Sequence, residues 1–507
     1  MKRTKLLFSA AVMLLSAVCL PGGCAPGAAD FGNSVGGGTT AAPSGEFGAT
    51  QGGVQDMGLA RELIKNGRVP PAEAFIIEGM FSEHDLPLTG DACERTLCLR
   101  GALGVAPDAS GTSSGWLQIG LSSNVDMETF QRPTLTLIAC VDVSGSMGWP
   151  ISTEAEEYPT PGTVARAVLR AIVQELNAGD RLALVSFGSE VYDVLPLTSG
   201  DSQETLATAI AGLGEGGSTN MEAGLQRAYE LANEAGRPTE EVRVLLFTDT
   251  QPNVGATEAS EFDQLVSAGT ESQIGITVFA FGVGIGQEVL NAMAHVRGAN
   301  AFSLMDFEDV PKLMEESWPW MFSPIAYDLR VLLTPTAGFQ VGESYGFPAA
   351  APGANPGLET STVFLSKKKG ALLVQLVPVQ GTSLHGLAVA GKLTYATPEG
   401  EGVTEDISAA YNDEPLDQRG QYFPQPSVAT TVALALLTAA MNQAATEYAT
   451  SHETAIVTLE AALARYTADV ANLDDSTLVT ERDLAQSLLD LMENGAEQGD
   501  LYGYGQY

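Results

Sequence analysis

Basic residues are scarce in this sequence. Its 507 residues include 25 Lys and Arg against 62 Asp and Glu, which gives a formal net charge of −37. A field of this sign repels phosphate backbones, so nucleic acid is not expected as a partner. Because 45% of the residues are hydrophobic, the chain can still bury sizeable cores, which argues against global disorder.

Histidine and cysteine are also few. The 4 histidines are scattered among 507 residues, and no Cys/His cluster has the spacing of a zinc site or of a thiol catalyst. No HExxH motif, no pair of catalytic carboxylates and no Ser-His-Asp order stands out. We therefore assign no catalytic residues and expect a protein that is not an enzyme.

Residues 1–23 have the composition of an export signal. Basic residues near the start precede an apolar run over residues 6–20, which is too short to span a membrane comfortably. Two glycines then stand directly before Cys24. The segment resembles a bacterial lipoprotein signal with Cys24 as the lipidated first residue, and a plain secretory signal is the alternative. The resemblance implies a membrane anchor in the bacterial cell envelope, as in an outer-membrane lipoprotein.

Two features that follow the signal agree with export. Residues 24–55 are rich in Gly, Ser, Thr, Ala and Pro, which predicts a flexible tether. Cys93 and Cys98 stand five positions apart in a loop-like segment and are expected to form a disulfide in an oxidising compartment.

The pattern of apolar residues divides the remainder of the chain. Strands and helices alternate over residues 134–322, which predicts an α/β fold with a doubly wound, mainly parallel sheet. The flanking parts are a small mixed region, an antiparallel β-sandwich in which Lys367–Gly370 forms a hairpin tip, a helical region and a flexible tail. Their expected bounds are 56–133, 323–412, 427–495 and 496–507.

Oxygen-bearing side chains follow three strands of the predicted sheet. Asp142, Ser144 and Ser146 come directly after the first buried strand, Thr219 stands in a glycine-rich loop, and Asp249 follows a later strand. Ligands on such sheets bind beyond the carboxyl ends of the strands. Carboxylate and hydroxyl oxygens suit a hard divalent cation such as Mg²⁺. Turn and helix capping by these residues is the plainer alternative.

With these motifs the middle region resembles a von Willebrand factor type A domain, and the same five residues match its metal-ion-dependent adhesion site. The family usually has Gly where Thr250 stands. Residues 59–81 and 324–328 are similar to the segments that flank this domain in bacterial lipoproteins. The resemblance implies that Mg²⁺, with Ca²⁺ or Mn²⁺ possible, is held by the five residues and keeps one position open for an acidic side chain of a protein partner.

These expectations lead to a cation-dependent protein-binding module, for adhesion or as a scaffold, anchored to the envelope by lipid. The alternatives are a structural envelope protein whose metal stabilises the fold, and a non-catalytic subunit of an enzyme assembly. Between Ser146 and the next helix lies a Pro-containing acidic segment with Glu154, Glu156 and Glu157. We expect a loop there, which is a solvated segment without a role, a segment whose carboxylates compete with the partner, or an extension of the partner-binding surface.

Overall fold

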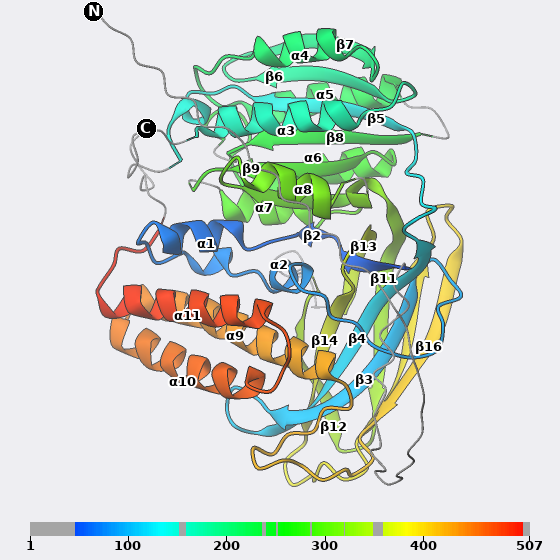
Figure 1. Cartoon of the computed structure of the whole chain (residues 1–507), viewed down its shortest axis with the longest axis vertical. Helices are drawn as coiled ribbons and strands as arrows, with labels where there is room; N and C mark the ends of the chain where they lie inside the picture. Colours follow the sequence, from blue (N-terminus) through cyan, green and yellow to red (C-terminus); the bar gives the residue numbers. More distant parts are fainter. Residues whose placement is uncertain are drawn as a thin grey trace, which may run out of the picture. The chain divides into compact units, whose positions relative to one another are not determined.

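A mixed sheet covered by helices forms the middle of the chain (Figure 1). The computed structural model describes residues 46–151, 159–235, 240–249, 252–283, 286–318, 320–347 and 358–499. In these residues the strand order is β2-β10-β9-β8-β5-β6-β7, and neighbours are parallel except β6 and β7. The strands are β2 (Gly53–Val54), β5 (Leu135–Asp142), β6 (Arg181–Phe187), β7 (Val191–Ser199), β8 (Glu241–Thr248), β9 (Gly275–Phe281) and β10 (Ala299–Leu304).

The helices divide between the two faces of this sheet. Helix α3 packs against α4 and against α8, whereas α6 packs against α5 and against α7. Because both faces are covered, strands β5 and β9 are buried along their whole length, and their sequences are almost continuously apolar. The predicted α/β fold is confirmed. The helices are α3 (Pro161–Glu175), α4 (Gln203–Ala211), α5 (Met221–Ala235), α6 (Ala259–Glu271), α7 (Gln287–Ala294) and α8 (Asp309–Glu316).

The order of the strands reverses at β5. The chain passes from β5 through α3 to β6 on one side, and it later returns to β8 on the other side of β5. The loops that leave the carboxyl ends of β5 and β8 therefore diverge. Such a switch point leaves a crevice in which sheets of this kind bind ligands.

A second, antiparallel sheet takes strands from both sides of the α/β region. Its order is β12-β14-β4-β1-β13-β11-β15-β16, with β3 paired to β4. The expected sandwich over 323–412 therefore does not stand by itself, because strands from before residue 133 lie inside its sheet. The strands of the whole antiparallel sheet are β1 (Glu46–Gln51), β3 (Cys98–Pro107), β4 (Ser113–Asp126), β11 (Pro324–Pro335), β12 (Phe339–Tyr345), β13 (Glu359–Ser366), β14 (Gly370–Pro378), β15 (Ala388–Ala396) and β16 (Gly402–Ala410).

The lysine-rich turn between β13 and β14 is not the hairpin tip that the sequence predicts. Strand β13 pairs with β1 and β11, while β14 pairs with β4 and β12, so the turn carries the chain across β1. The crossing is close: a Cβ atom added to Gly48 would lie 1.9 Å from the carbonyl oxygen of Lys368. A glycine is therefore required where the two backbones meet.

The expected tether over 24–55 extends too far toward the C-terminus. Residues 46–51 form β1, and residues 53–54 form β2 at the edge of the α/β sheet, where β2 pairs with β10. Glycines in this stretch were interpreted as a sign of flexibility, but Gly48 serves close packing, and Gly53 adopts a φ of 102°. One short segment thus joins both sheets.

The C-terminal region is helical, as expected. Helix α9 is mostly buried inside the protein. Within the described residues it is the one helix whose length and composition would allow it to cross a membrane, a property that core helices share. Figure 1 shows α9 and α11 beside the N-terminal helices α1 and α2, and α1 contacts α11. These helices are α1 (Gly58–Lys65), α2 (Ile77–Ser82), α9 (Pro426–Tyr448), α10 (His452–Val470) and α11 (Thr477–Glu493).

A buried charged cluster fixes α11 to the N-terminal helices. Arg61 of α1 donates to both carboxylate oxygens of Glu481, at 3.0 and 2.9 Å, and also contacts Glu83. The ring of His84 lies 3.3 Å from Glu481 and 3.0 Å from the hydroxyl of Thr477. Burial opposes ionisation of Glu481, but the hydrogen bond from His84 and the charge of Arg61 together hold its pKa below the ordinary value.

The crossing at Gly48 can be tested by adding one methyl group. Gly48→Ala places a carbon against the backbone of residues 368–369, so we expect a loss of about 1–3 kcal/mol in the free energy of unfolding. Gly402→Ala, where a Cβ meets no atom within 4 Å, is the matched control and should change stability by less than about 0.5 kcal/mol. Urea unfolding followed by circular dichroism measures both. Equal stabilities would contradict the close crossing.

The pKa of Glu481 predicts how its contribution depends on pH. Since the folded-state pKa is lowered, the carboxylate stabilises the fold fully above the unfolded-state pKa of about 4.3 and loses this effect as pH falls below it. We expect the difference in unfolding free energy between the unmodified protein and Glu481→Gln to be constant from neutral pH to about pH 5 and to shrink below about pH 4. A difference that persists in strong acid would refute this assignment.

Candidate cation and partner site

The site begins at the buried end of β5. The carboxylate of Asp142 accepts hydrogen bonds from the backbone N–H of Ser144, at 2.8 Å, and from the hydroxyl of Thr248, at 2.8 Å. Thr248 ends the neighbouring strand β8. Burial raises the pKa of Asp142 to about 6, although the hydrogen bonds from Ser144 and Thr248 act in the opposite direction. The group is therefore short of compensating charge.

A glycine-rich loop folds against the loop that follows β5. The N–H of Gly216 donates to the carbonyl of Val143 at 2.7 Å, and the N–H of Gly145 donates to the carbonyl of Gly217 at 3.0 Å. Gly217 has a φ of 89°, which favours glycine, and a Cβ there would lie 2.5 Å from the hydroxyl of Ser189. These bonds bring the segment that carries Thr219 to the end of β5.

The five predicted ligands lie in three loops that meet at this edge. Asp142, Ser144, Thr219 and Asp249 are buried, and Ser146 is half-buried with its hydroxyl 3.1 Å from that of Ser144. The donor set of two carboxylates and three hydroxyls is oxygen only, as Mg²⁺ or Ca²⁺ requires. Within the described residues no three His, Cys, Asp or Glu side chains group as a metal site would need. A site with two carboxylates would not form such a group.

Asn253, which is not among the predicted site residues, holds Thr219 in place. The side-chain oxygen of Asn253 accepts from the N–H of Thr219 at 2.8 Å, and its own N–H donates to the carbonyl of Thr219 at 3.1 Å. The N–H of Val254 donates to the same carbonyl at 3.2 Å. The loop after β8 is thus hydrogen-bonded to the segment before α5. In the sequence, only the position of Asn253, four residues beyond Asp249, indicates that it lies near the site. The hydrogen bond itself joins residues 34 positions apart, in two different loops.

The other predicted sites lie away from this edge or outside the described residues. Cys93 and Cys98 form a disulfide, with their Cα atoms 5.8 Å apart. Cys24 and Thr250 lie outside the described residues, as does the acidic segment with Glu154, Glu156 and Glu157.

Comparison with known proteins bears on the α/β region. Residues 137–251, which carry all five predicted ligands, match the family model of the von Willebrand factor type A domain. The chain contains a von Willebrand factor type A domain. The family model spans less than half of the chain, so this statement concerns the domain. Domains of this type generally mediate protein interactions or adhesion.

Two similar proteins extend the comparison. The uncharacterized protein YfbK of Escherichia coli strain K12 is 28% identical over 208 residues, which make up 40% of this chain and 34% of YfbK. The chain thus matches about a third of the length of this curated relative. The solved structure of a von Willebrand factor type A protein from Catenulispora acidiphila has 12% identity and a TM-score of 0.50, and covers 82% of this chain and 99% of its own. At this identity the likeness shows the fold.

Replacing Asn253 should weaken the predicted cation site of the type A domain. Asn253→Ala removes the acceptor that fixes the N–H of Thr219, and loss of such a supporting contact typically lowers metal affinity about 10–100-fold. Asn253→Asp keeps the acceptor oxygen and should retain the affinity. Calorimetric titration with MgCl₂, alongside circular dichroism to verify folding, measures the effect. A folded Asn253→Ala protein with unchanged affinity would exclude this role.

Proposed function

We propose that this protein is a divalent-cation-dependent protein-binding module, for adhesion or as a scaffold, tethered to the bacterial cell envelope through lipid on Cys24. The observation that carries the proposal is the convergence of two carboxylates and three hydroxyls at the switch point of the sheet. The signal-like N-terminus supports export and a lipid anchor, as in an outer-membrane lipoprotein.

The residues at this edge fit a hard cation. Asp142 and Asp249 carry two negative charges in a buried place, and Mg²⁺, or Ca²⁺ or Mn²⁺, would supply the compensating charge. Asp142, Ser144, Ser146, Thr219 and Asp249 would hold it. Burial raises the pKa of Asp142 to about 6, which indicates a carboxylate that its hydrogen bonds do not fully stabilise.

The partner that fits this edge is a protein with an acidic side chain, for which the half-buried Ser146 marks the accessible side of the cluster. Apolar surface lies beside it: the side chains of Trp149 and Val254 are 38% and 42% exposed. Trp149 follows the loop of Ser146, and Val254 is bonded to Thr219. An apolar residue beside the partner's acid would pack on either one. Nucleic acid is disfavoured by the net charge of −37.

Two other functions use the same site. In one, the cation only stabilises an envelope protein of structural role. In the other, the chain is a non-catalytic subunit of an enzyme assembly. In all three we assign the chain no catalysis of its own. The acidic segment with Glu154, Glu156 and Glu157 leaves the loop of Ser146, and its carboxylates are a possible competitor for the partner's acid.

Removing the ligands one at a time tests the proposal. We expect Asp142→Ala and Thr219→Ala each to reduce Mg²⁺ affinity by more than the about 10–100-fold typical of supporting residues. The exposed residues Asp201 and Thr208 provide matched controls as Asp201→Ala and Thr208→Ala, which should bind as the unmodified protein does. Calorimetric titration of the full chain in detergent measures affinity.

Thermal unfolding with and without EDTA separates the proposal from its structural alternative. The proposed binding role predicts that chelation lowers the unfolding temperature only by the amount that the measured Mg²⁺ affinity accounts for, and that the protein stays folded, because apolar strands hold the sheet together. A large fall on chelation would favour a structural metal. Unchanged Mg²⁺ affinity in both ligand variants would overturn the cation site itself.

A further inference from the structure

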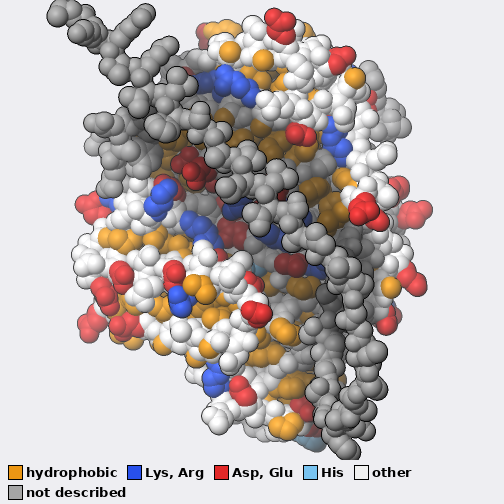
Figure 2. Space-filling view, viewed as in Figure 1, with side chains coloured by type: hydrophobic (Ala, Val, Ile, Leu, Met, Phe, Trp, Pro, Cys, Tyr) orange, Lys and Arg blue, Asp and Glu red, His pale blue; other side chains and the backbone are white. Residues whose placement is uncertain are grey.

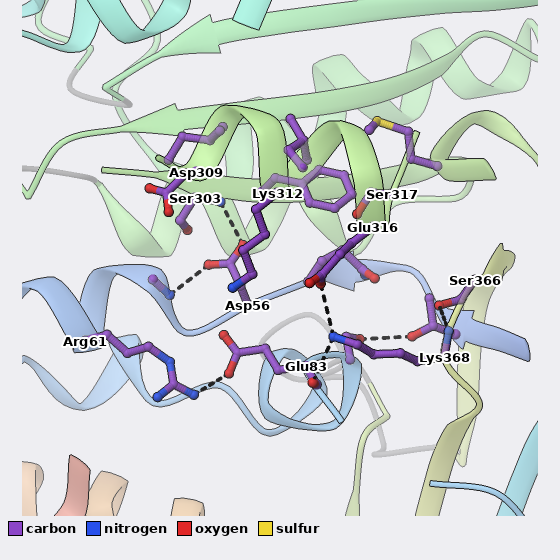
Figure 3. A pocket seen from close by; sticks show the side chains of 18 of the residues that line it. Asp56, Arg61, Glu83, Ser303, Asp309, Lys312, Glu316, Ser317, Ser366 and Lys368 are labelled. Atoms are coloured by element: carbon purple, nitrogen blue, oxygen red, sulfur yellow. Dashed lines mark hydrogen bonds and ion pairs between the residues drawn. The ribbon is translucent and has the colours of Figure 1, made fainter. Parts of the chain in front are cut away.

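A pocket of about 520 Å³ lies away from the predicted cation site, and none of the five predicted ligands lines it. Its walls come from the N-terminal segment with α1, from β10 and α8 of the type A domain, from the turn after β13, and from α11 (Figure 3). The volume is in the range of small-molecule sites, and junctions between structural regions are where such sites often form.

Most charges in the pocket are already matched. Arg61 pairs with Glu83 and Glu481, and Lys368 pairs with Glu316, at 3.2 Å, and also donates to the backbone carbonyl of Glu83. Among the described residues, eight acidic and four basic side chains line the pocket. The lining is therefore negative overall, so a phosphate-bearing or otherwise anionic ligand is disfavoured. On the face shown in Figure 2, acidic and basic side chains gather between the α/β region and the C-terminal helices.

Asp56 and Lys312 are two of the five charged side chains in the pocket that form no ion pair within the described residues; the others are the acids Asp306, Glu308 and Asp309. Asp56 accepts from the N–H groups of Gly58 and Ser303, both at 2.8 Å, and forms no ion pair with another described residue. The side-chain ammonium group of Lys312, an exposed residue of α8, likewise forms no ion pair or hydrogen bond within the described part of the chain. Figure 3 shows both side chains directed into the space between α8 and the N-terminal segment.

Asp56 is half-buried, so its carboxylate is partly removed from water. The pKa of Asp56 is raised to about 6, mainly by burial and also by the nearby charge of Glu83, because the hydrogen bonds from Ser303 and Gly58 only partly oppose these two effects. A carboxylate in such a place gains more from a bound ammonium group than one in water does. Apolar side chains of Phe302, Leu313 and Trp320 line the same pocket and would pack along an aliphatic chain.

A metal ion is a poor occupant by comparison. In this pocket the described residues contain no group of three or more His, Cys, Asp or Glu side chains that could hold one. An organic ligand fits the pocket better. The apolar side chains favour an aliphatic part, and the unpaired Asp56 and Lys312 favour a ligand that carries both a positive and a negative group.

We propose that this pocket binds a small basic amino acid, with an ammonium group at Asp56, the carboxylate at Lys312 and the aliphatic chain on Phe302 and Leu313. Such a ligand has a net positive charge, which suits the negative lining, and carries one anionic group for Lys312. The site is independent of the cation-dependent function proposed above, because it shares no residue with it.

The probe pair is L-lysine and cadaverine, which differ by the carboxylate. We expect L-lysine to bind the full chain in calorimetric titration and cadaverine to bind at least about tenfold more weakly, because Lys312 repels it and gains no partner. Lys312→Gln should weaken L-lysine binding at least about tenfold while leaving cadaverine no weaker than before. Lys392→Gln, an exposed lysine of β15 paired with Asp406, is the matched control and should change neither affinity.

Asp56→Asn tests the other end of the ligand. It should weaken both L-lysine and cadaverine at least about tenfold, whereas Asp201→Asn, at an exposed aspartate, should weaken neither. Because Asp56 also accepts two backbone hydrogen bonds, this variant could fail to fold, in which case the Lys312→Gln result decides. The proposal is overturned if L-lysine gives no binding at millimolar concentration, or if Lys312→Gln leaves its affinity unchanged.

Discussion

The buried carboxylate of Asp142 is the constraint on which the candidate site depends. Removing a carboxylate from water costs several kcal/mol unless hydrogen bonds or an opposite charge compensate. Two donors compensate in part, the N–H of Ser144 and the hydroxyl of Thr248, and each comes from a different strand end. Both bonds stabilise the charge, and the bond from Thr248 also ties β5 to β8. Asp249 follows Thr248 directly, so a second carboxylate is carried to the same edge.

Strand β8 links this edge to the second sheet. At its other end Arg243 is fully buried and donates to the carbonyls of Ile276 and Gly298, at 3.1 and 2.9 Å. Its guanidinium also lies over the rings of Phe322 and Phe364, 5.8 and 5.5 Å from their centres. Phe364 belongs to β13 of the antiparallel sheet. At one end of β8 the buried Arg243 faces the second sheet, and at the other end the strand leads into the acidic site. The site is therefore attached to a strand that is fixed at both ends.

Local patterns predicted the parts of the molecule that depend on short stretches of chain. The α/β alternation follows from buried apolar runs such as β5, and the three ligand loops follow from polar residues at the ends of such runs. The role of Asn253 could not be predicted, because it depends on a contact between two loops that only the folded sheet brings together. The place of β1 and β4 within the second sheet depends on pairings across more than 200 positions. At Gly48 the sequence signal itself was ambiguous, since a glycine that permits flexibility and one that permits close packing look alike.

The charge of the whole chain limits how an acidic partner could bind. A net charge of −37 repels such a partner at long range, and this repulsion decays over about 8 Å at physiological ionic strength. The attraction must therefore come from groups that act only at contact, which here are the cation-ready cluster and the exposed parts of Trp149 and Val254. A partner whose acidic side chain does not reach the cluster is repelled by the net charge and gains no compensating attraction. The same charge that slows association would thus make the proposed site selective, because the repulsion is offset only for a partner whose acid reaches the cluster.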